Sequence, residues 1–319
     1  MKKIIAMVAL VIIAVPATIL AQTYPERAIR IIVGYAPGGG NDIAARLMAP
    51  KLSEALGQPV IVENKPGAGT NIATEYVSKS APDGYTLLLG SPAIAINRSL
   101  YGKLPFDALR DLTGVCMFAV SANIMVVNPS LPVKNVKELI VLARSKPGAL
   151  TFSSSGKGSS LHLTGELFNL RAKVDTLHVA YKGTAPALTA LISGEGDISY
   201  TNIPSALPLI KSGRLRVIAN TGNKRAELLP DVPTLKESGV DVDTIVWYSI
   251  VAPAATPRPI IDKLAGALKK ISQTPEMKKH LADLGAEPAG GTPEELNKHL
   301  RDETAQWAEV IKAAGIKLE

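Results

Sequence analysis

Two short loops rich in glycine and serine carry the residues best suited to chemistry in this chain. The first loop spans residues 35–42, Tyr-Ala-Pro-Gly-Gly-Gly-Asn-Asp, and the second spans 153–160, Ser-Ser-Ser-Gly-Lys-Gly-Ser-Ser. Each follows an apolar run and precedes a helical pattern, so the unpaired N–H groups of a helix start are expected beside it. Glycines let a ligand approach the backbone closely, and Ser hydroxyls add donors. Together the loops predict capture of a small anion, although a capped tight turn also explains either loop alone.

Asp42 and His162 are the titratable residues that accompany these loops. Asp42 is expected to be a helix N-cap that holds the first loop in shape, because an unpaired carboxylate beside a bound anion would repel it. On this interpretation Asp42→Asn should weaken ligand binding less than Gly39→Val or Gly40→Pro, since Asn also caps helices well. His162 is expected to close the start of the second helix or to line the binding cleft.

The spacing of the remaining reactive residues argues against an enzyme, a metal site and a nucleotide cofactor. A hydrolase would need His162 beside Ser160, but two residues at this spacing on a helix start face different directions. Gly156 and Gly158 lack a third glycine at position 161, and Lys157 is not followed by Ser or Thr. The other histidines have no metal-ligand spacing; they are His178, His280 and His299. We expect no catalytic residue, no metal and no cofactor.

Strand-like runs alternate with helical segments in two sets, which predicts an α/β fold with parallel sheets covered on both faces. In the first set, a strand over Ile29–Tyr35 precedes a helix expected from Asp42 to about Leu56. The long apolar runs that separate the sets are expected to cross between domains; they are Leu112–Val120, Ile124–Asn128 and Thr244–Ala252. The expected domains are 22–123 plus 246–319, and 124–245.

The first residues have the order of a secretory signal peptide. Lys2 and Lys3 precede the apolar run Ile4–Val15 and Pro16. That run is shorter than the roughly 20 residues that span a bilayer, which argues against a retained anchor. We expect a signal peptide over 1–21, cleavage near Gln22 and a periplasmic mature protein.

Composition limits the partners. The formal charge is +7 at pH 7, but the basic residues are dispersed and aromatic residues make up only 4% of the chain. Nucleic acid is therefore not an expected partner. The only Cys is Cys116, so an internal disulfide is excluded.

Six motifs, taken together and in order, resemble those of the Bug receptors, the periplasmic solute-binding proteins of tripartite tricarboxylate transporters. They lie between Tyr24 and the C-terminus. The motifs are YAPGGGND at 35–42, VENKPGAG at 62–69, PDGY at 82–85, SGKGSSLHL at 155–163, YKGTAPA at 181–187 and LPDVPT at 229–234.

The resemblance implies a two-domain periplasmic binding protein of type II, the Venus-flytrap fold, with a cleft between two βα domains. A ligand carboxylate is then expected between the two loops, held by backbone N–H groups and bound water. Small-carboxylate capture, transporter subunits as partners and a monomeric receptor are implied as well. The expected ligand-binding residues are Tyr35, Ala36, Pro37, Gly38, Gly39, Asn41, Asp42, Ser91, Ser155, Lys157, Ser159, Ser160, His162, Thr184, Thr201 and Asn202.

Three positions depart from the expected family pattern. Lys157 stands where Asn is usual, Thr201 where an acid is common, and Thr70 where Gly is usual. A positive charge gained and a negative charge lost near the pocket favour a ligand with two acidic groups, unless Lys157 extends into solvent instead. Two other functions remain open: a ligand-occupied sensor that docks on a signalling protein, and a secreted hydrolase.

Overall fold

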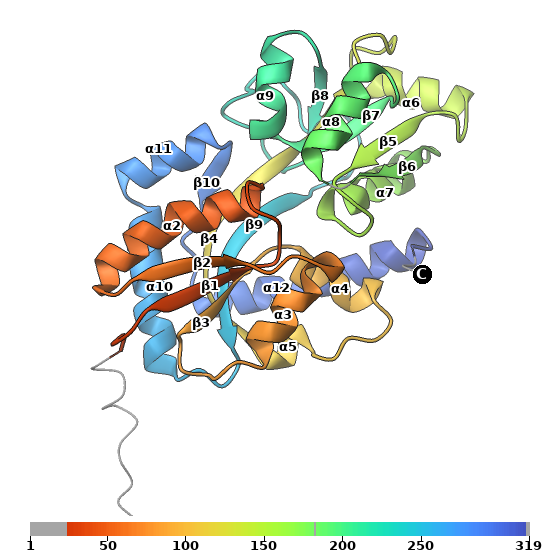
Figure 1. Cartoon of the computed structure of the whole chain (residues 1–319). Helices are drawn as coiled ribbons and strands as arrows, with labels where there is room; N and C mark the ends of the chain where they lie inside the picture. Colours follow the sequence, from red (N-terminus) through yellow and green to blue (C-terminus); the bar gives the residue numbers. More distant parts are fainter. Residues whose placement is uncertain (1–23, 182, 317–319) are drawn as a thin grey trace, which may run out of the picture.

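The first βα set forms a parallel sheet with its helices on both faces (Figure 1). The computed structural model describes residues 24–181 and 183–316; the predicted signal peptide lies outside the described residues. Strand β1 pairs in parallel with both β2 and β3. The elements are β1 (Ile29–Val33), α2 (Gly40–Leu56), β2 (Val60–Asn64), η1 (Ala68–Thr70), α3 (Asn71–Ser78), β3 (Thr86–Gly90), α4 (Ala93–Leu100) and α5 (Ala108–Asp111).

One long strand, β4 (Leu112–Val127), connects the first set to the second. The two apolar runs that residues 121–123 separate in the sequence belong to this single strand. Ser121 and Ala122 pair with β9 (Ile245–Pro253), and Asn123 pairs with β7 (Ile198–Asn202). Because partners on both sides of the polar stretch keep its backbone hydrogen-bonded, the chain stays extended through it.

The second set repeats the βα pattern. Strand β5 pairs in parallel with β6 and β7, and β8 pairs with β4. Its elements are α6 (Val136–Ser145), β5 (Thr151–Ser154), α7 (Ser160–Ala172), β6 (Leu177–Ala180), α8 (Thr184–Ser193), β7, α9 (Ile203–Lys211) and β8 (Arg216–Asn220).

After β9 the chain completes the first sheet and its helical cover. Strand β9 lies between β3 and β4 and is antiparallel to both. The last elements are α10 (Arg258–Ser272), α11 (Pro275–Asp283), β10 (Ala286–Pro288) and α12 (Pro293–Ala313). No described helix is long and apolar enough to span a membrane.

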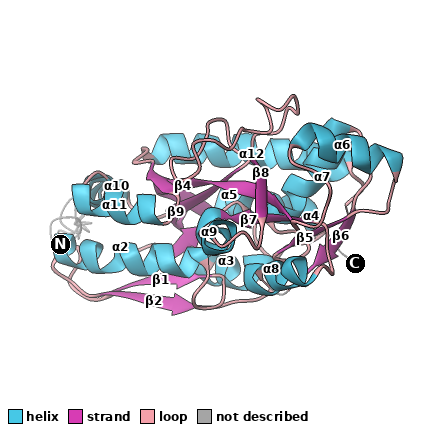
Figure 2. Ribbon diagram, turned by 90° about the horizontal axis from the view of Figure 1, so that it is seen from above, coloured by secondary structure: helices cyan, strands magenta, loops and turns pink. Residues whose placement is uncertain are grey.

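Strand directions decide which loops face each other. Because β3 and β4 are both antiparallel to β9, the strands β1, β2 and β3 run the same way as β4, toward the second set. Strand β7 is antiparallel to β4, so β5, β6 and β7 run back toward the first set. The carboxyl ends of both parallel sets therefore point at the junction between them, which is where α/β proteins bind ligands (Figure 2).

The C-terminal helix links the two sets. Trp307, Val310 and Ile311 of α12 share one buried apolar cluster with Leu167 and Phe168 of α7. Closer to its start, α12 packs its apolar side chains with the first set, and the buried carboxylate of Glu303 accepts a 2.7 Å hydrogen bond from Nε1 of Trp247 in β9. Helix α12 therefore contacts both halves of the molecule.

Candidate functional site

The first loop ends on a helix start whose backbone donors are open. Helix α2 begins at Gly40, and its N-cap is Gly39, which supplies no side chain to the N–H groups that follow. The prediction that Asp42 is the N-cap is therefore wrong. Among the described residues, the N–H groups of Gly39, Gly40 and Asn41 have no hydrogen-bond acceptor. An exposed helix start of this kind favours an anion.

Asp42 nevertheless holds the first loop in shape, as predicted. Its carboxylate is only 3% exposed and accepts hydrogen bonds from the Gly38 N–H at 2.9 Å, Arg46 Nε at 3.0 Å and Asn64 Nδ2 at 2.8 Å. Burial acts to raise the pKa of Asp42, but these hydrogen bonds outweigh it and hold that pKa below its ordinary value. The ionised carboxylate is thus neutralised by Arg46 instead of repelling an anion.

Asn64, at the end of β2, is a positioning residue that the list of expected site residues omitted. Besides Asp42, its amide nitrogen reaches the carbonyl oxygen of Tyr35 at 3.0 Å, and its amide oxygen accepts from Arg46 at 2.9 Å. The sequence offered a signal, since Asn64 lies inside the motif at 62–69.

Two tyrosines stand beside the first loop. Tyr35 and Ser91, both expected site residues, share a 3.0 Å hydrogen bond. Tyr248 of β9 brings its hydroxyl so close to Gly40 that a methyl group added there would lie 3.0 Å from it. Burial, and then the neighbouring Tyr35, raises the pKa of Tyr248 to about 12, so its hydroxyl stays protonated at neutral pH.

The second loop presents a second helix start. Ser159 is the N-cap of α7, and its hydroxyl accepts the His162 N–H at 3.2 Å. Among the described residues, the N–H groups of Ser160 and Leu161 have no acceptor. Lys157, at the tip of the loop, is exposed.

His162 closes the helix start, as predicted. The ring is 3% exposed, and its Nδ1 accepts the Gly158 N–H at 3.0 Å. A Ser–His contact does exist nearby, between Ser154 Oγ and His178 Nε2 at 2.7 Å, which the sequence did not predict. Because Ser154 is fully buried, its hydroxyl cannot meet a substrate as a nucleophile would have to.

The other expected site residues of the second set differ in accessibility. Thr184 is half-buried at the start of α8, directly after Gly183, whose N–H donates to the Ser155 carbonyl at 3.1 Å. Asn202 caps α9 by accepting the Ser205 N–H at 3.0 Å. Thr201 is 0% exposed in β7, and its hydroxyl has no partner among the described residues.

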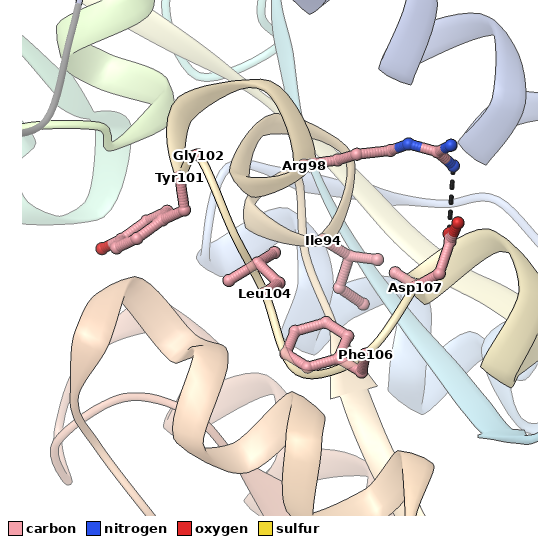
Figure 3. Close-up of a pocket in the computed structure, with 8 residues that line it drawn as sticks. Ile94, Arg98, Tyr101, Gly102, Leu104, Phe106 and Asp107 are labelled. Carbon is pink, nitrogen blue, oxygen red and sulfur yellow. Dashed lines mark hydrogen bonds and ion pairs between the residues drawn. The ribbon is translucent and has the colours of Figure 1, made fainter.

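Two cavities lie apart from these loops. One of about 110 Å³ surrounds the Arg98–Asp107 ion pair beside α4 and α5 (Figure 3). Another of about 270 Å³ lies beside β4 and β10, where Lys224 pairs with Glu287. None of the expected ligand-binding residues lines either cavity. Within residues 24–181 and 183–316, no cluster of His, Cys, Asp and Glu could hold a metal ion.

Comparison with known proteins assigns this arrangement to a family. Residues 44–316 match the family described as "Tripartite tricarboxylate transporter family receptor", TctC. The chain belongs to the TctC family. It is 36% identical to Protein BugT of Bordetella pertussis over 324 residues, covering 100% of this chain and 99% of the relative.

Solved TctC-type structures share the whole architecture. The Rhodopseudomonas palustris protein Rpa4515 with adipate is 37% identical with a TM-score of 0.85, covering 92% of this chain and 99% of that one. Periplasmic binding protein BugD is 32% identical with a TM-score of 0.82, covering 93% and 100%. MatC from R. palustris with bound malate is 31% identical with a TM-score of 0.79, covering 90% and 100%.

Membership of the TctC family confirms three predictions from the sequence. The resemblance to Bug receptors is correct, and the fold is the two-domain α/β fold of periplasmic binding proteins. TctC proteins are periplasmic solute-binding receptors, so the chain is a receptor and not an enzyme.

Proposed function

We propose that this receptor captures a small dicarboxylate between its two loops and delivers it to a membrane transporter of the tripartite tricarboxylate type. The observation that carries the proposal is the pair of helix starts, at α2 and α7, whose N–H groups lack acceptors among the described residues. Both lie at the carboxyl ends of strands that point at the same junction. Relatives described with adipate and with malate support a ligand bearing two carboxylates.

One carboxylate of the ligand would lie between the two helix starts. Each start offers several N–H donors in a fixed direction and a partial positive charge, and an anion between them gains from both. The Asp42 carboxylate does not oppose this, because Arg46 and Asn64 neutralise and hydrogen-bond it. Tyr35, Ser91, Ser155, Ser159, Ser160, Thr184 and Asn202 are proposed as further contacts.

The second carboxylate would pair with Lys157. The Lys157 side chain is exposed at the tip of the second loop and forms no ion pair with a described residue. Closure of the cleft would therefore bring the Lys157 ammonium group, which has no ion-pair partner among the described residues, toward the ligand. Thr201 is neutral where the family pattern commonly has an acid, so no carboxylate at this position would repel a second acidic group of the ligand.

Identification of the ligand is the decisive experiment. Small molecules released from the purified protein are identified by mass spectrometry, and calorimetry then compares matched acids such as adipate and hexanoate. We expect the dicarboxylate to bind more tightly than the monocarboxylate. Tight binding of a zwitterionic amino acid, or no difference between the two acids, would contradict the proposal.

Lys157→Met tests the role of the second charge. The dicarboxylate should lose about 1.5–3 kcal/mol of binding free energy, the size of a hydrogen bond to a charged group, while the monocarboxylate changes little. Lys173→Met is the matched control, because Lys173 is also exposed but lies at the far end of α7. Equal losses for both acids in Lys157→Met would show that Lys157 does not select the second carboxylate.

Glycine substitutions test whether backbone donors bind the first carboxylate. Gly39→Val would cover the donors at the start of α2, and Gly40→Pro would remove one of them. We expect both to weaken calorimetric binding of the dicarboxylate strongly. Gly102→Ala is the control, since nothing lies within 4 Å of a methyl group at that exposed position. Undiminished binding in both variants would contradict the proposed site.

We further infer that the domains are 22–123 plus 246–319, and 124–245, and that they close around the ligand. The inferred boundaries fall where the connecting strands meet: the Thr221 N–H donates to Asn123 O at 2.9 Å, and the Thr244 N–H to Thr221 O at 2.8 Å. Small-angle scattering should show a smaller radius of gyration with the identified ligand bound. An unchanged radius would count against closure.

The proposed export route is tested separately. If residues 1–21 are a signal peptide, the mature protein should begin near Gln22 and be released by osmotic shock. We also propose that the mature protein is a monomer. N-terminal sequencing and light scattering measure both properties. An intact N-terminus on protein from the membrane fraction would contradict the proposed cleavage.

A further inference from the structure

Two histidine rings stack directly beneath the second loop. His162 belongs to α7 and His178 to β6, and their ring centroids are 3.8 Å apart with planes 25° from parallel. The fully buried ring of Phe152 in β5 supports the pair, with its centroid 4.9 Å from that of His178 and 6.3 Å from that of His162. The pair is therefore held between the strands and the first turn of α7.

His162 is held in one neutral tautomer. Its Nδ1 accepts the Gly158 N–H, so the ring proton must be on Nε2. That nitrogen lies 3.4 Å from Oε1 of Glu166, one turn further along α7, which is a suitable acceptor for the proton. Protonation of Nδ1 would set two donors against each other and release the Gly158 N–H.

His178 acts through the hydroxyl of Ser154. Gly156 O already accepts from the Ser159 N–H at 3.1 Å and from Ser159 Oγ at 2.8 Å, so both of its lone pairs are used. The one hydroxyl proton of Ser154 is then best directed at His178 Nε2, 2.7 Å away, instead of at Gly156 O, 3.1 Å away. The same hydroxyl oxygen accepts the Gly156 N–H at 3.2 Å, which anchors the loop at its first glycine.

We propose that His162 and His178 are positioning residues that shape the second loop. His162 accepts a hydrogen bond from the Gly158 N–H and His178 accepts one from the Ser154 hydroxyl, so that the N–H groups of Ser160 and Leu161 stay directed at the ligand. This inference rests on the proposed function for its effect on binding. Neither ring touches the ligand in this scheme; each acts through the loop backbone.

The surroundings of His178 favour its neutral ring. Burial first, then the neighbouring His162 and Lys157, lower the pKa of His178 to about 3. The charged side chains that face the pair are Lys157 from the loop and Glu166 from α7, while Phe152 from β5 supplies the aromatic contact and is itself packed against Tyr200 of β7. Two rings that each accept a hydrogen bond are thus packed face to face.

Substitutions by phenylalanine separate packing from hydrogen bonding. His162→Phe and His178→Phe keep an aromatic ring in the stack and remove the acceptor. We expect each to weaken adipate or malate binding by about three- to tenfold, the effect of losing one hydrogen bond. His280→Phe, at an exposed position on α11, is the matched control and should leave the affinity unchanged.

A double-mutant cycle tests the path through Ser154. If His178 acts by orienting that hydroxyl, Ser154→Ala combined with His178→Phe should lose no more affinity than the larger single loss. Additive losses would show that His178 acts by another route. Thermal unfolding of each variant, measured in parallel, identifies any variant whose lower affinity reflects lost folding.

Two measurements on the ligand-free protein test the inference even if no acid binds. Nitrogen NMR should find Nδ1 of His162 and Nε2 of His178 without protons at pH 7, and amide exchange at Gly158 should accelerate in His162→Phe. A proton on Nδ1 of His162, or unchanged exchange at Gly158, would overturn the inference. If the wild-type protein binds none of the acids while both results hold, the proposed function fails and the positioning role stands.

Discussion

The two loops do the same work with different chemistry. The first is shaped by an ionised carboxylate, Asp42, which gathers Arg46, Asn64 and the Gly38 N–H. The second is shaped by neutral groups, the rings of His162 and His178 and the hydroxyl of Ser154. In each case a buried acceptor takes an N–H of a loop glycine, and other donors at the helix start are left without one. The fold therefore requires that each loop glycine N–H has a hydrogen-bond acceptor, but that acceptor can be charged or neutral.

Gly165→Ala should have the largest effect on stability, because it introduces a steric clash beneath the second loop. A methyl group at Gly165 would lie 2.2 Å from Cε2 of Phe152, so α7 would have to move off β5. We expect the free energy of unfolding to fall by about 1–3 kcal/mol, measured by urea denaturation. Gly266→Ala in α10 meets nothing within 4 Å and should instead gain about 0.5–1 kcal/mol. Equal effects of the two changes would refute this account of the packing.

Asp42→Asn should be the most damaging polar change in the first loop. The carboxylate accepts hydrogen bonds on both oxygens, so an amide NH2 group placed there would face donors. We expect a loss of about 2 kcal/mol in the free energy of unfolding. Asp262→Asn, which breaks an exposed pair with Arg258, is the control and should cost less than about 0.5 kcal/mol. A mild Asp42→Asn would show that the charge of this carboxylate is not needed to hold the first loop.

Ser91→Ala should have a smaller effect, since it removes a single hydrogen bond to Tyr35. The expected loss in the free energy of unfolding is about 1 kcal/mol, and Tyr35→Phe should lose a similar amount. If the two hydroxyls interact only with each other, the double variant should cost little more than either single change. A fully additive double variant would place their partners elsewhere.

Acidification should distinguish the two loops by the pH at which each loses stability, and this is the smallest of the expected effects. The pKa of His178 in the folded protein is about 3, below the roughly 6.5 of a free imidazole, so its contribution to stability is complete above pH 6.5 and is lost as the pH falls toward 3. The Asp42 pKa is also lowered, so its contribution is lost only below about pH 4. Because the His178 ring is only partly buried, the dependence of stability on pH should be shallow. In His178→Phe the slope of the free energy of unfolding against pH should decrease between pH 6 and 4. An unchanged slope there would show that His178 is not the group responsible.

Local patterns predicted both loops, because a strand, a glycine turn and a helix follow each other directly in the sequence. The contacts that shape the loops depend on pairings between distant residues. Tyr248 reaches Gly40 only because β9 inserts beside β3, and His178 reaches Ser154 only because β5 and β6 are paired. The N-cap at Asp42 was predicted wrongly since capping statistics favour Asp, whereas here Gly39 takes the cap position and Asp42 reaches back to Gly38.

The position of β9 has a consequence for how the chain acquires its structure. The strand comes from residues 245–253, yet it fills the gap between β3 and β4, which are complete by residue 127. While the chain is being synthesised, both neighbours would present unpaired, apolar strand edges until the last quarter of the chain arrives, and such edges invite aggregation. The strands of the second set pair within residues 124–245, so its sheet is free of this delay. Pulse-labelled truncations ending before residue 245 should accordingly protect the second set from proteolysis while leaving β1 and β3 open to cleavage.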